Sequence, residues 1–314
     1  MRRWLAAAVA SLACAQANCA YSQNFPDRPI RLVVPFPPGG NVDSFARVLA
    51  RQVENQLGQA IVIDNRGGAN GIVGADIVAK AAPNGYTLLG TSIAFVVNAG
   101  MYRKLPYDSE QDFVPITNFA FGLGYLLTVN PAVPAQTVKE LIALAKAGSE
   151  PLRYSTPGIG NGQHLAAELF ATQAGIQLLH VPYKGGGPAL NAVLGGEVQI
   201  NFPATAVGAP HVKAGKLRAL GFTGAQRVAS LPDVPTIAEA GLPGYRFDSG
   251  WHAWFAPAKT PPLIVAKLYA AIRMALQEPR LRDYFVAGGY EPRGDPPEEF
   301  RRIFNSDIKL YAGI

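Results

Sequence analysis

The stretch "RLVVPFPPGGNVDSFARVLARQVENQLG", residues 31–58, contains the pattern that decides the fold. Its first apolar residues have the composition of a short buried strand, and the prolines and glycines after them predict an abrupt turn. The following residues place apolar side chains at helical spacing as far as Gly58, a typical helix end. The stretch therefore predicts a strand, a tight turn and a helix whose first turn contains no basic residue.

The same order of strand, glycine turn and helix recurs along the chain. "AIVIDN" (60–65) and "YTLLGTS" (86–92) predict two further strands with a helix between them, and a second, similar set begins near Leu126. In that set, strands are predicted at 152–156, 176–183, 197–202 and 217–222, and helices at 162–175 and 188–196. An extended segment at 247–258 and helices at 260–277, 280–289 and 296–311 follow. This alternation predicts an α/β fold with mostly parallel sheets.

We expect two α/β lobes, because the chain is long enough for two cores. No low-complexity linker separates the two sets, so the lobes are expected to be joined by two crossing segments, near 125–131 and 246–255. The predicted lobes are 21–127 plus 250–314, and 128–249. Between such lobes lies a cleft where strand ends and helix starts of both lobes face each other.

Residues 1–20 have the order of a secretory signal peptide. Arg2 and Arg3 precede a short apolar run, which small residues follow as far as Ala20. The apolar run is too short to span a bilayer. We predict cleavage near Ala20, with Ala17 as the alternative, and hence a protein of the periplasm or the outside of the cell.

Both cysteines, Cys14 and Cys19, lie in this leader, so the mature protein is predicted to contain no thiol and no disulfide. Lipidation of Cys14 is an alternative, although Ser11 stands where a branched apolar residue is expected. Loss of the leader takes the formal charge from +6 to +4. The remaining basic residues are scattered, which does not favour a nucleic-acid partner.

The glycine turn at residues 35–43 is the first candidate binding site. Pro37 and Pro38 stiffen the backbone, and Gly39 and Gly40 allow a ligand to approach the backbone N–H groups. The helix start adds unpaired N–H groups and a partial positive charge, which favour an anion. No Gly-Lys-Ser/Thr follows, so a carboxylate fits better than a nucleotide. The alternative is a turn that only packs a strand onto a helix.

Two turns of the second half repeat this arrangement. "STPGIGNGQHLAAELF" (155–170) contains G-x-G-x-G rather than the dinucleotide pattern, and no acid that would hold a ribose follows about twenty residues on. "VPYKGGGPAL" (181–190) exposes backbone again, and its Tyr183 can stack or donate a hydrogen bond, whereas Lys184 is more typical of a solvated side chain. We therefore predict that these two turns form binding sites for an anion or a hydroxyl group.

Four polar residues near the turns have two possible roles each. Thr91 and Ser92 can donate hydroxyl groups at the cleft or cap the next helix. Asp43 can contact a ligand or stabilise the first turn of its helix. His164 can bind a ligand, although a capping or packing role is commoner for a histidine at that position.

The sequence gives little support to catalysis. The four histidines show no metal-ligand spacing, no G-x-S-x-G motif is present, and a single acid in a glycine turn is not an acid–base pair. We therefore expect neither a catalytic residue nor a metal or other cofactor. Aromatic residues can lie near the cleft, which permits an aromatic carboxylate, or belong to the core. They are Phe36, Phe95, Tyr183, Phe202 and Trp251.

Segments spread over the whole mature chain resemble the Bug family, the extracytoplasmic solute receptors of tripartite tricarboxylate transporters. The resemblance rests on "YSQNFPDRPIRLVVPFPPGGNVDSFAR", "VIDNRGGANGIVGADIVAKAAPNGYTLL", "YSTPGIGNGQHLAAELF", "HVPYKGGGPALNAVLGGEVQINF", "HVKAGKLRALGFT" and "LPDVPTIAEAGLPGYRFDSGWHAWFAPAKTP".

The resemblance implies a type II periplasmic-binding-protein fold whose lobes close over a small organic carboxylate without covalent chemistry. It also implies membrane subunits of such a transporter as partners. We expect a monomer. In the first lobe the family's ligand contacts match Phe36, Gly39, Gly40, Asp43, Thr91 and Ser92. In the second lobe they match Ser155, Gly158, Gly160, His164, Tyr183 and Gly185.

Two departures from the family's pattern bear on the ligand. The chain has "GGANG" where many relatives have Pro-Gly-Ala-Gly-Gly, so Asn70 can add a polar contact. Pro203 follows Phe202 where many relatives carry an acid, which disfavours a ligand with an amino group. We include Asn70 and Phe202 among the candidate site residues.

Two other functions stay open. A secreted hydrolase or lyase on a similar frame needs a nucleophile, an acid–base pair or a metal site, none of which is evident. A sensor that presents bound carboxylate to a membrane signalling partner differs from a transport receptor only in its partner.

Overall fold

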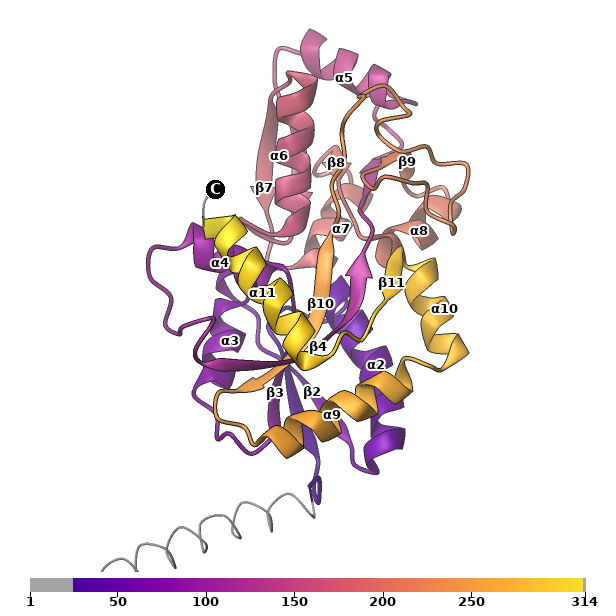
Figure 1. The fold of residues 1–314 in the computed structure, drawn as a ribbon. Helices are drawn as coiled ribbons and strands as arrows, with labels where there is room; N and C mark the ends of the chain where they lie inside the picture. The colour runs from indigo at the N-terminus through magenta and orange to yellow at the C-terminus, as the bar shows by residue number, and fades with distance from the viewer. Residues whose placement is uncertain (1–24, 313–314) are drawn as a thin grey trace, which may run out of the picture.

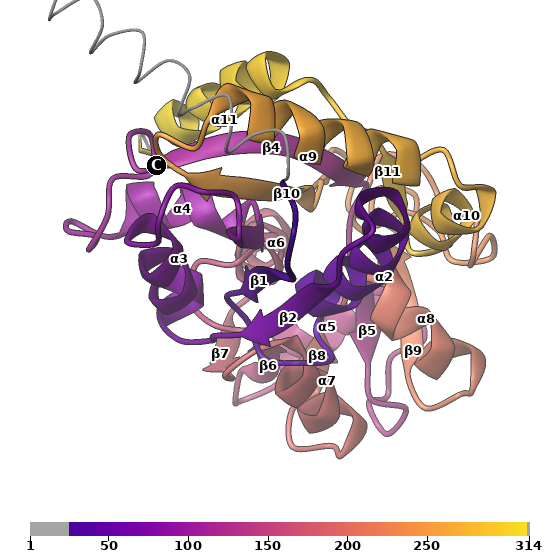
Figure 2. The same ribbon diagram turned by 90° about the horizontal axis from the view of Figure 1, so that it is seen from below.

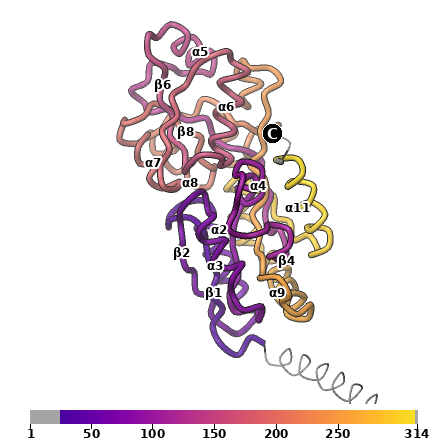
Figure 3. The backbone as a smooth tube through the Cα atoms, turned by 90° about the vertical axis from the view of Figure 1, so that its left-hand side faces the viewer, coloured from indigo at the N-terminus to yellow at the C-terminus, as the bar shows by residue number. Residues whose placement is uncertain are grey.

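The computed structural model describes residues 25–312 as two α/β lobes, each built around its own sheet (Figure 1). The predicted signal peptide, its cleavage near Ala20 and the alternative lipidation of Cys14 lie outside the described residues. The tube in Figure 3 shows the middle of the chain above and both terminal parts below. The predicted α/β class with two lobes is confirmed.

The first sheet has six strands in the order β11-β4-β10-β3-β1-β2. They are β1 (Ile30–Val34), β2 (Ile61–Asn65), β3 (Thr87–Ser92), β4 (Phe113–Gly122), β10 (Gly250–Pro257) and β11 (Tyr290–Pro292). β1 pairs in parallel with β2 and β3, as the predicted β-α-β pattern requires. β10 lies antiparallel between β3 and β4, so the second half of the sheet is antiparallel.

Helices cover both faces of this sheet and bury its apolar residues. They are α2 (Asn41–Leu57), η1 (Ala69–Gly71), α3 (Ile72–Ala79), α4 (Ala94–Met101), α9 (Pro262–Ala275), α10 (Pro279–Ala287) and α11 (Pro297–Ala312). Figure 2 shows β1 and β2 between α3 and α4 on one side and α2 on the other. Phe45 and Leu268 are buried on the α2 and α9 side, and Phe95 and Phe304 on the α4 and α11 side.

The second sheet has five strands in the order β7-β6-β8-β5-β9. They are β5 (Leu126–Val129), β6 (Leu152–Thr156), β7 (Leu178–Pro182), β8 (Ile200–Asn201) and β9 (Arg218–Phe222). Its helices are α5 (Val138–Ala147), α6 (Gly162–Ala174), α7 (Gly186–Leu194) and α8 (Thr205–Lys213). β6 is parallel to β7 and β8, whereas β5 is antiparallel to β8 and β9.

Two chain segments far apart in the sequence run side by side where the lobes join. The chain leaves the first sheet after β4 and returns to it at β10. The Ser249 N–H donates to the Gly122 carbonyl over 3.0 Å, which joins the two crossings directly. Thr223, directly after β9, links them as well, because its N–H donates to the Tyr125 carbonyl over 2.9 Å and its carbonyl accepts from the Phe247 N–H over 2.8 Å. The two crossings thus form one narrow connection between the lobes, the paired crossing.

The structure extends the sequence prediction in three places. The strand β4 and the helices α4 and α8 are not evident from periodicity. β4 contains Pro115, which cannot donate to a ladder, and the pairing with β10 is irregular next to it. The Thr137 side chain caps α5 by accepting from the Glu140 N–H. Thr236 and Glu239 make reciprocal hydrogen bonds around a turn rather than an α-helix. Among residues 25–312, no helix is long and apolar enough to cross a membrane.

Candidate functional site

A crevice lies between the lobes, on the side where the strands of both sheets give way to helices. It encloses about 550 Å³, part of it open to solvent. Among the described residues that line it, none is Lys, Arg, Asp or Glu. A ligand in this crevice therefore meets backbone groups and neutral side chains.

Four helices begin at this crevice, two from each lobe. Residues at the starts of α2 and α4 line it from the first lobe, and residues at the starts of α6 and α7 from the second. The residues in question are Gly40, Ile93, Asn161 and Gly186. A helix start carries unpaired N–H groups and about half a positive charge. The four starts together favour a negatively charged group in the crevice, without a cationic side chain.

Three of these helix starts offer their backbone to the crevice because no side chain caps them in the described part of the chain. The N-cap residues of α2 and α7 are Gly40 and Gly185, which have no side chain, and that of α4 is Ile93. At α6 the Asn161 side chain accepts from the N–H groups of Gln163 and His164. An anion can supply the acceptor that the three uncapped starts lack.

The two lobes touch each other at the rim of the crevice. Gly185 has φ +119°, and a Cβ atom there would lie 2.7 Å from the Pro37 ring of the other lobe. A Cβ atom on Gly186 would lie 3.7 Å from the Gly40 Cα atom. At Gly185 the lobes can approach this closely only because the residue is glycine, whereas a Cβ atom on Gly186 would make an ordinary van der Waals contact. The structure therefore represents the lobes in contact, with a narrow space between them.

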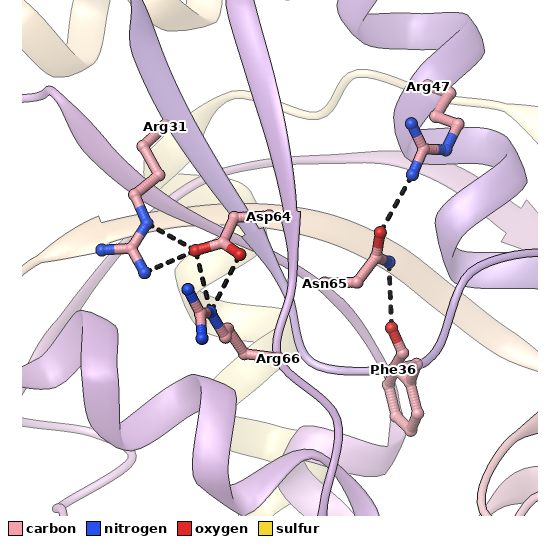
Figure 4. Close-up of polar contacts among 6 residues, drawn as sticks. All are labelled: Arg31, Phe36, Arg47, Asp64, Asn65 and Arg66. Carbon is pink, nitrogen blue, oxygen red and sulfur yellow. Dashed lines mark hydrogen bonds and ion pairs between the residues drawn. The ribbon is translucent and has the colours of Figure 1, made fainter.

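Asp43 stabilises the first glycine turn, residues 35–43, through hydrogen bonds. Its carboxylate accepts from the Gly39 N–H over 3.0 Å and from Asn65 Nδ2 over 2.8 Å, and it pairs with Arg47 at 2.9 Å. Asn65 also donates to the Phe36 carbonyl, and Figure 4 shows it between Arg47 and Phe36. Burial alone would raise the pKa of Asp43, but the hydrogen bonds from Arg47, Gly39 and Asn65 outweigh it and hold the pKa below its ordinary value.

Asp64 of β2, next to Asn65 in the sequence, takes part in a second set of ion pairs. Asp64 accepts from Arg31 over 2.8 Å and from Arg66 over 2.9 Å (Figure 4). Both arginine side chains are substantially exposed, so the pair contributes about 0–1 kcal/mol. These two cations do not line the crevice.

Two histidines brace the turn of the second lobe in the same way. His164 Nδ1 accepts from the Gly160 N–H over 3.3 Å, and the rings of His164 and His180 stack with centroids 4.2 Å apart. His180 Nε2 lies 2.6 Å from the Thr156 hydroxyl, which in turn accepts from the Gly158 N–H. Gly158, Gly160 and His164 thus shape the turn whose later residues line the crevice.

Burial keeps both imidazoles neutral at pH 7. It lowers the pKa of His164, and it lowers that of His180 to about 4, with the neighbouring His164 adding to the effect and Glu168 opposing it. The pair therefore acts through neutral hydrogen bonds and ring contacts, and supplies no positive charge to a ligand.

Three further predicted residues of the second lobe lie outside the lining. Ser155 is buried and donates to the Ala189 carbonyl over 2.8 Å. Tyr183 donates to Glu197 over 3.1 Å on the surface. Phe202 is fully buried in the core of its lobe. Gly185 lies at the rim, and its neighbour Gly186 lines the crevice.

In the first lobe, Phe36, Gly40 and Ser92 line the crevice, whereas Gly39, Thr91 and Asn70 do not. Thr91 is buried in β3 opposite β10. The Asn70 side chain donates to Asn98 over 2.9 Å, and its Nδ2 atom would lie 3.6 Å from a Cβ atom on Gly160 of the other lobe.

Sequence reasoning missed several lining residues. Asn41 directly follows the predicted Gly40, so the glycine turn itself was a sufficient signal for it. Tyr125, Ser249 and His252 come from the paired crossing and from β10, which approach the glycine turns only in the folded chain. In the described part of the chain, no group of three or more His, Cys, Asp or Glu residues is arranged to hold a metal ion.

Two lobes, a paired crossing and a crevice at converging helix starts define a solute-binding receptor of the periplasmic type. A family model described as "Tripartite tricarboxylate transporter family receptor" matches residues 45–310. The chain belongs to this family, which confirms the resemblance noted from the sequence motifs.

Relatives match over nearly the whole chain. The "UPF0065 protein in tcbD-tcbE intergenic region" of Pseudomonas sp. (strain P51) is 38% identical over 314 residues, which are 100% of this chain and 93% of the relative. Protein BugT of Bordetella pertussis is 36% identical and covers 93% of this chain and 90% of its own.

Solved structures agree with the fold. R. palustris Rpa4515 with adipate has a TM-score of 0.86 and 34% identity, covering 92% of this chain and 99% of its own. MatC from Rhodopseudomonas palustris with bound malate has a TM-score of 0.84 and 31% identity, with the same coverage. The predicted periplasmic-binding-protein fold is confirmed by these matches.

If Asp43 braces the glycine turn, Asp43→Asn will lower the free energy of unfolding by about 1–3 kcal/mol, because it removes a buried, multiply bonded charge. Urea unfolding measures this. Asp64→Asn, at the more exposed ion pair, is the control and should change stability by less than about 1 kcal/mol. Equal effects of the two substitutions would show that Asp43 is not a buried brace.

The folded protein should lose stability as the pH falls from about 6.5 towards 4. The pKa of His180 is lower in the folded state than its ordinary 6.5, so the unfolded chain binds a proton first and is favoured on acidification. His180→Gln removes this contribution, and its melting temperature should fall less steeply over that interval. Parallel curves for the two proteins would contradict a neutral His180 in the folded state.

Proposed function

We propose that the crevice binds a small organic carboxylate and that the protein delivers it to the membrane subunits of a tripartite tricarboxylate transporter. The observation that carries this proposal is the convergence of four helix starts on a space whose described lining contains no basic side chain. A carboxylate supplies oxygen acceptors for several backbone N–H groups at once. A cationic solute would meet only the positive ends of the helix dipoles.

Binding proceeds by lobe closure without covalent chemistry. The moving units follow the predicted lobes, residues 21–127 plus 250–314 and residues 128–249, except that Leu126 and Leu127 belong to β5 of the second sheet. The two lobes rotate about the paired crossing. On closure, the turn with Pro37 meets Gly185, and the solute is enclosed between helix starts from both lobes. The solute then adds its own contacts to those between the lobes, which favours the closed state over the open one.

Similar structures in the family support this ligand class. R. palustris Rpa4515 is described with adipate and MatC with malate, both of them small organic carboxylates. We propose Phe36, Gly40 and Ser92 as direct contacts of the ligand. Asp43 and His164 shape the walls of the crevice through their bonds to Gly39 and Gly160.

The proposal also covers the export, the location, the oligomeric state and the lack of enzymatic activity of the protein. We propose export through the leader at residues 1–20, a periplasmic location, a monomeric state and no enzymatic turnover. The neutral lining residues offer side chains for binding rather than an acid–base pair. A signalling role would use the same closed state with a different membrane partner.

Calorimetric titration with adipate, malate, succinate, benzoate, aspartate and glucose tests the proposal. At least one carboxylate should bind and raise the melting temperature of the protein. In Gly186→Leu the added side chain enters the space opposite Gly40, so that affinity should fall at least about tenfold, or about 1.4 kcal/mol. Gly195→Leu, at the exposed end of the same helix, is the control and should bind like the unmodified protein.

Two results would overturn the proposal. One is binding of glucose without binding of any carboxylate. The other is carboxylate binding that Gly186→Leu leaves unchanged, because the ligand would then lie outside the crevice.

A further inference from the structure

Three polar side chains at the β10 side of the crevice have atoms without a hydrogen-bond partner among residues 25–312. They are Asn41 Oδ1, Ser249 Oγ and His252 Nδ1, and all three residues line the crevice. His252 is only 3% exposed and Ser249 only 4%. Buried polar atoms nearly always find a partner, and leaving one unpaired costs about 1–3 kcal/mol. A group of three in one cavity indicates that a ligand supplies the missing partner.

The hydrogen bonds that these three side chains already make show which of their donors and acceptors still have no partner. Asn41 Nδ2 lies 3.1 Å from His252 Nε2 and also donates to the Tyr290 hydroxyl. With the Asn41 amide as donor, His252 Nε2 is an acceptor, and the proton of the neutral ring lies on Nδ1. The unmatched groups are therefore a donor at His252 Nδ1, an acceptor at Asn41 Oδ1, and a Ser249 hydroxyl that can be either.

The surroundings of His252 are apolar and uncharged. The rings of Phe45, Tyr290 and Phe119 lie with centroids 5.4, 5.2 and 6.1 Å from its ring. The Tyr290 hydroxyl lies 3.3 Å from His252 Nε2, and the phenol of Tyr125 lines the same crevice. Burial raises the pKa of both phenols, and the neighbouring Ser249 hydroxyl opposes this shift in each case. Burial also lowers the pKa of His252 to about 3, so that the imidazole is neutral at pH 7.

A second carboxylate fits this end of the crevice less well than a hydroxyl group. The first carboxylate already occupies the helix starts, and a second one has no hydrogen to donate to the acceptor Asn41 Oδ1, which would stay unpaired beside a buried charge. A hydroxyl group satisfies all three side chains, because its oxygen accepts from the His252 Nδ1–H and from the Ser249 hydroxyl while its hydrogen is donated to Asn41 Oδ1.

We propose that the ligand is a hydroxycarboxylic acid whose hydroxyl group binds His252, Ser249 and Asn41 at the β10 side of the crevice. This inference rests on the proposed function, which places the carboxylate at the helix starts. It adds a second subsite that selects for a neutral group able both to donate and to accept.

Two matched ligand series test this subsite by calorimetry at pH 7. One is hexanoate, 6-hydroxyhexanoate and adipate, and the other is butyrate, 4-hydroxybutyrate and succinate. Within the series that binds more tightly, the hydroxy acid should bind at least about tenfold more tightly than the other two, because it alone pairs the buried groups.

Two variants locate the effect. His252→Phe keeps the ring contacts and removes both nitrogens, and Ser249→Ala removes one hydroxyl and is the milder substitution if the first fails to fold. In either variant, the preference for the hydroxy acid over the simple acid should fall to less than about threefold.

Equal affinities within a series would overturn the hydroxyl subsite. So would tightest binding of the dicarboxylate with uptake of one proton, because His252 would then be a cation. In both cases carboxylates still bind, and the proposed function stands. If no member of either series and no carboxylate of the wider panel binds, the proposed function fails and the subsite with it.

Discussion

The attraction between a negative charge and the unpaired N–H groups of helix starts is the interaction on which the proposed binding of a carboxylate depends. Four helices, two in each lobe, begin at one crevice, and three of them have no side-chain cap in the described part of the chain. The backbone thus performs the role that Arg or Lys performs in many anion sites. Because the N–H groups belong to both lobes, a bound carboxylate also links the lobes and favours closure.

This arrangement explains why the glycine turns present backbone without side chains to the crevice. It also explains why buried polar side chains hold these turns from the side away from the ligand. The opposing lobe reaches the backbone at Gly185 because no Cβ atom intervenes, and Gly40 and Gly186 present backbone without a side chain to a ligand in the crevice. Glycine turns are flexible by themselves, so buried polar side chains hold their shape. Asp43 does this in one lobe, and His164 with His180 in the other. Residues that resemble ligand contacts in the sequence therefore act mainly through the turns they position.

The sequence predicted the local part of the fold and only part of the site. The strand-turn-helix units follow from short-range periodicity, and they led to Phe36, Gly40 and Ser92 in the lining. The antiparallel strands β4 and β10 depend on pairing between distant segments, which periodicity does not contain. The residues at the β10 side of the crevice were not predicted for the same reason, since His252 and Ser249 approach Asn41 only after the paired crossing has formed.

A crystal structure with the carboxylate that binds most tightly in the calorimetric panel tests the central claim most directly. The account predicts a carboxylate in the crevice, with its oxygens about 3 Å from backbone N–H groups at the starts of helices from both lobes and no Lys or Arg side chain in contact. A carboxylate held by an arginine or lysine, or one bound outside the crevice, would contradict it.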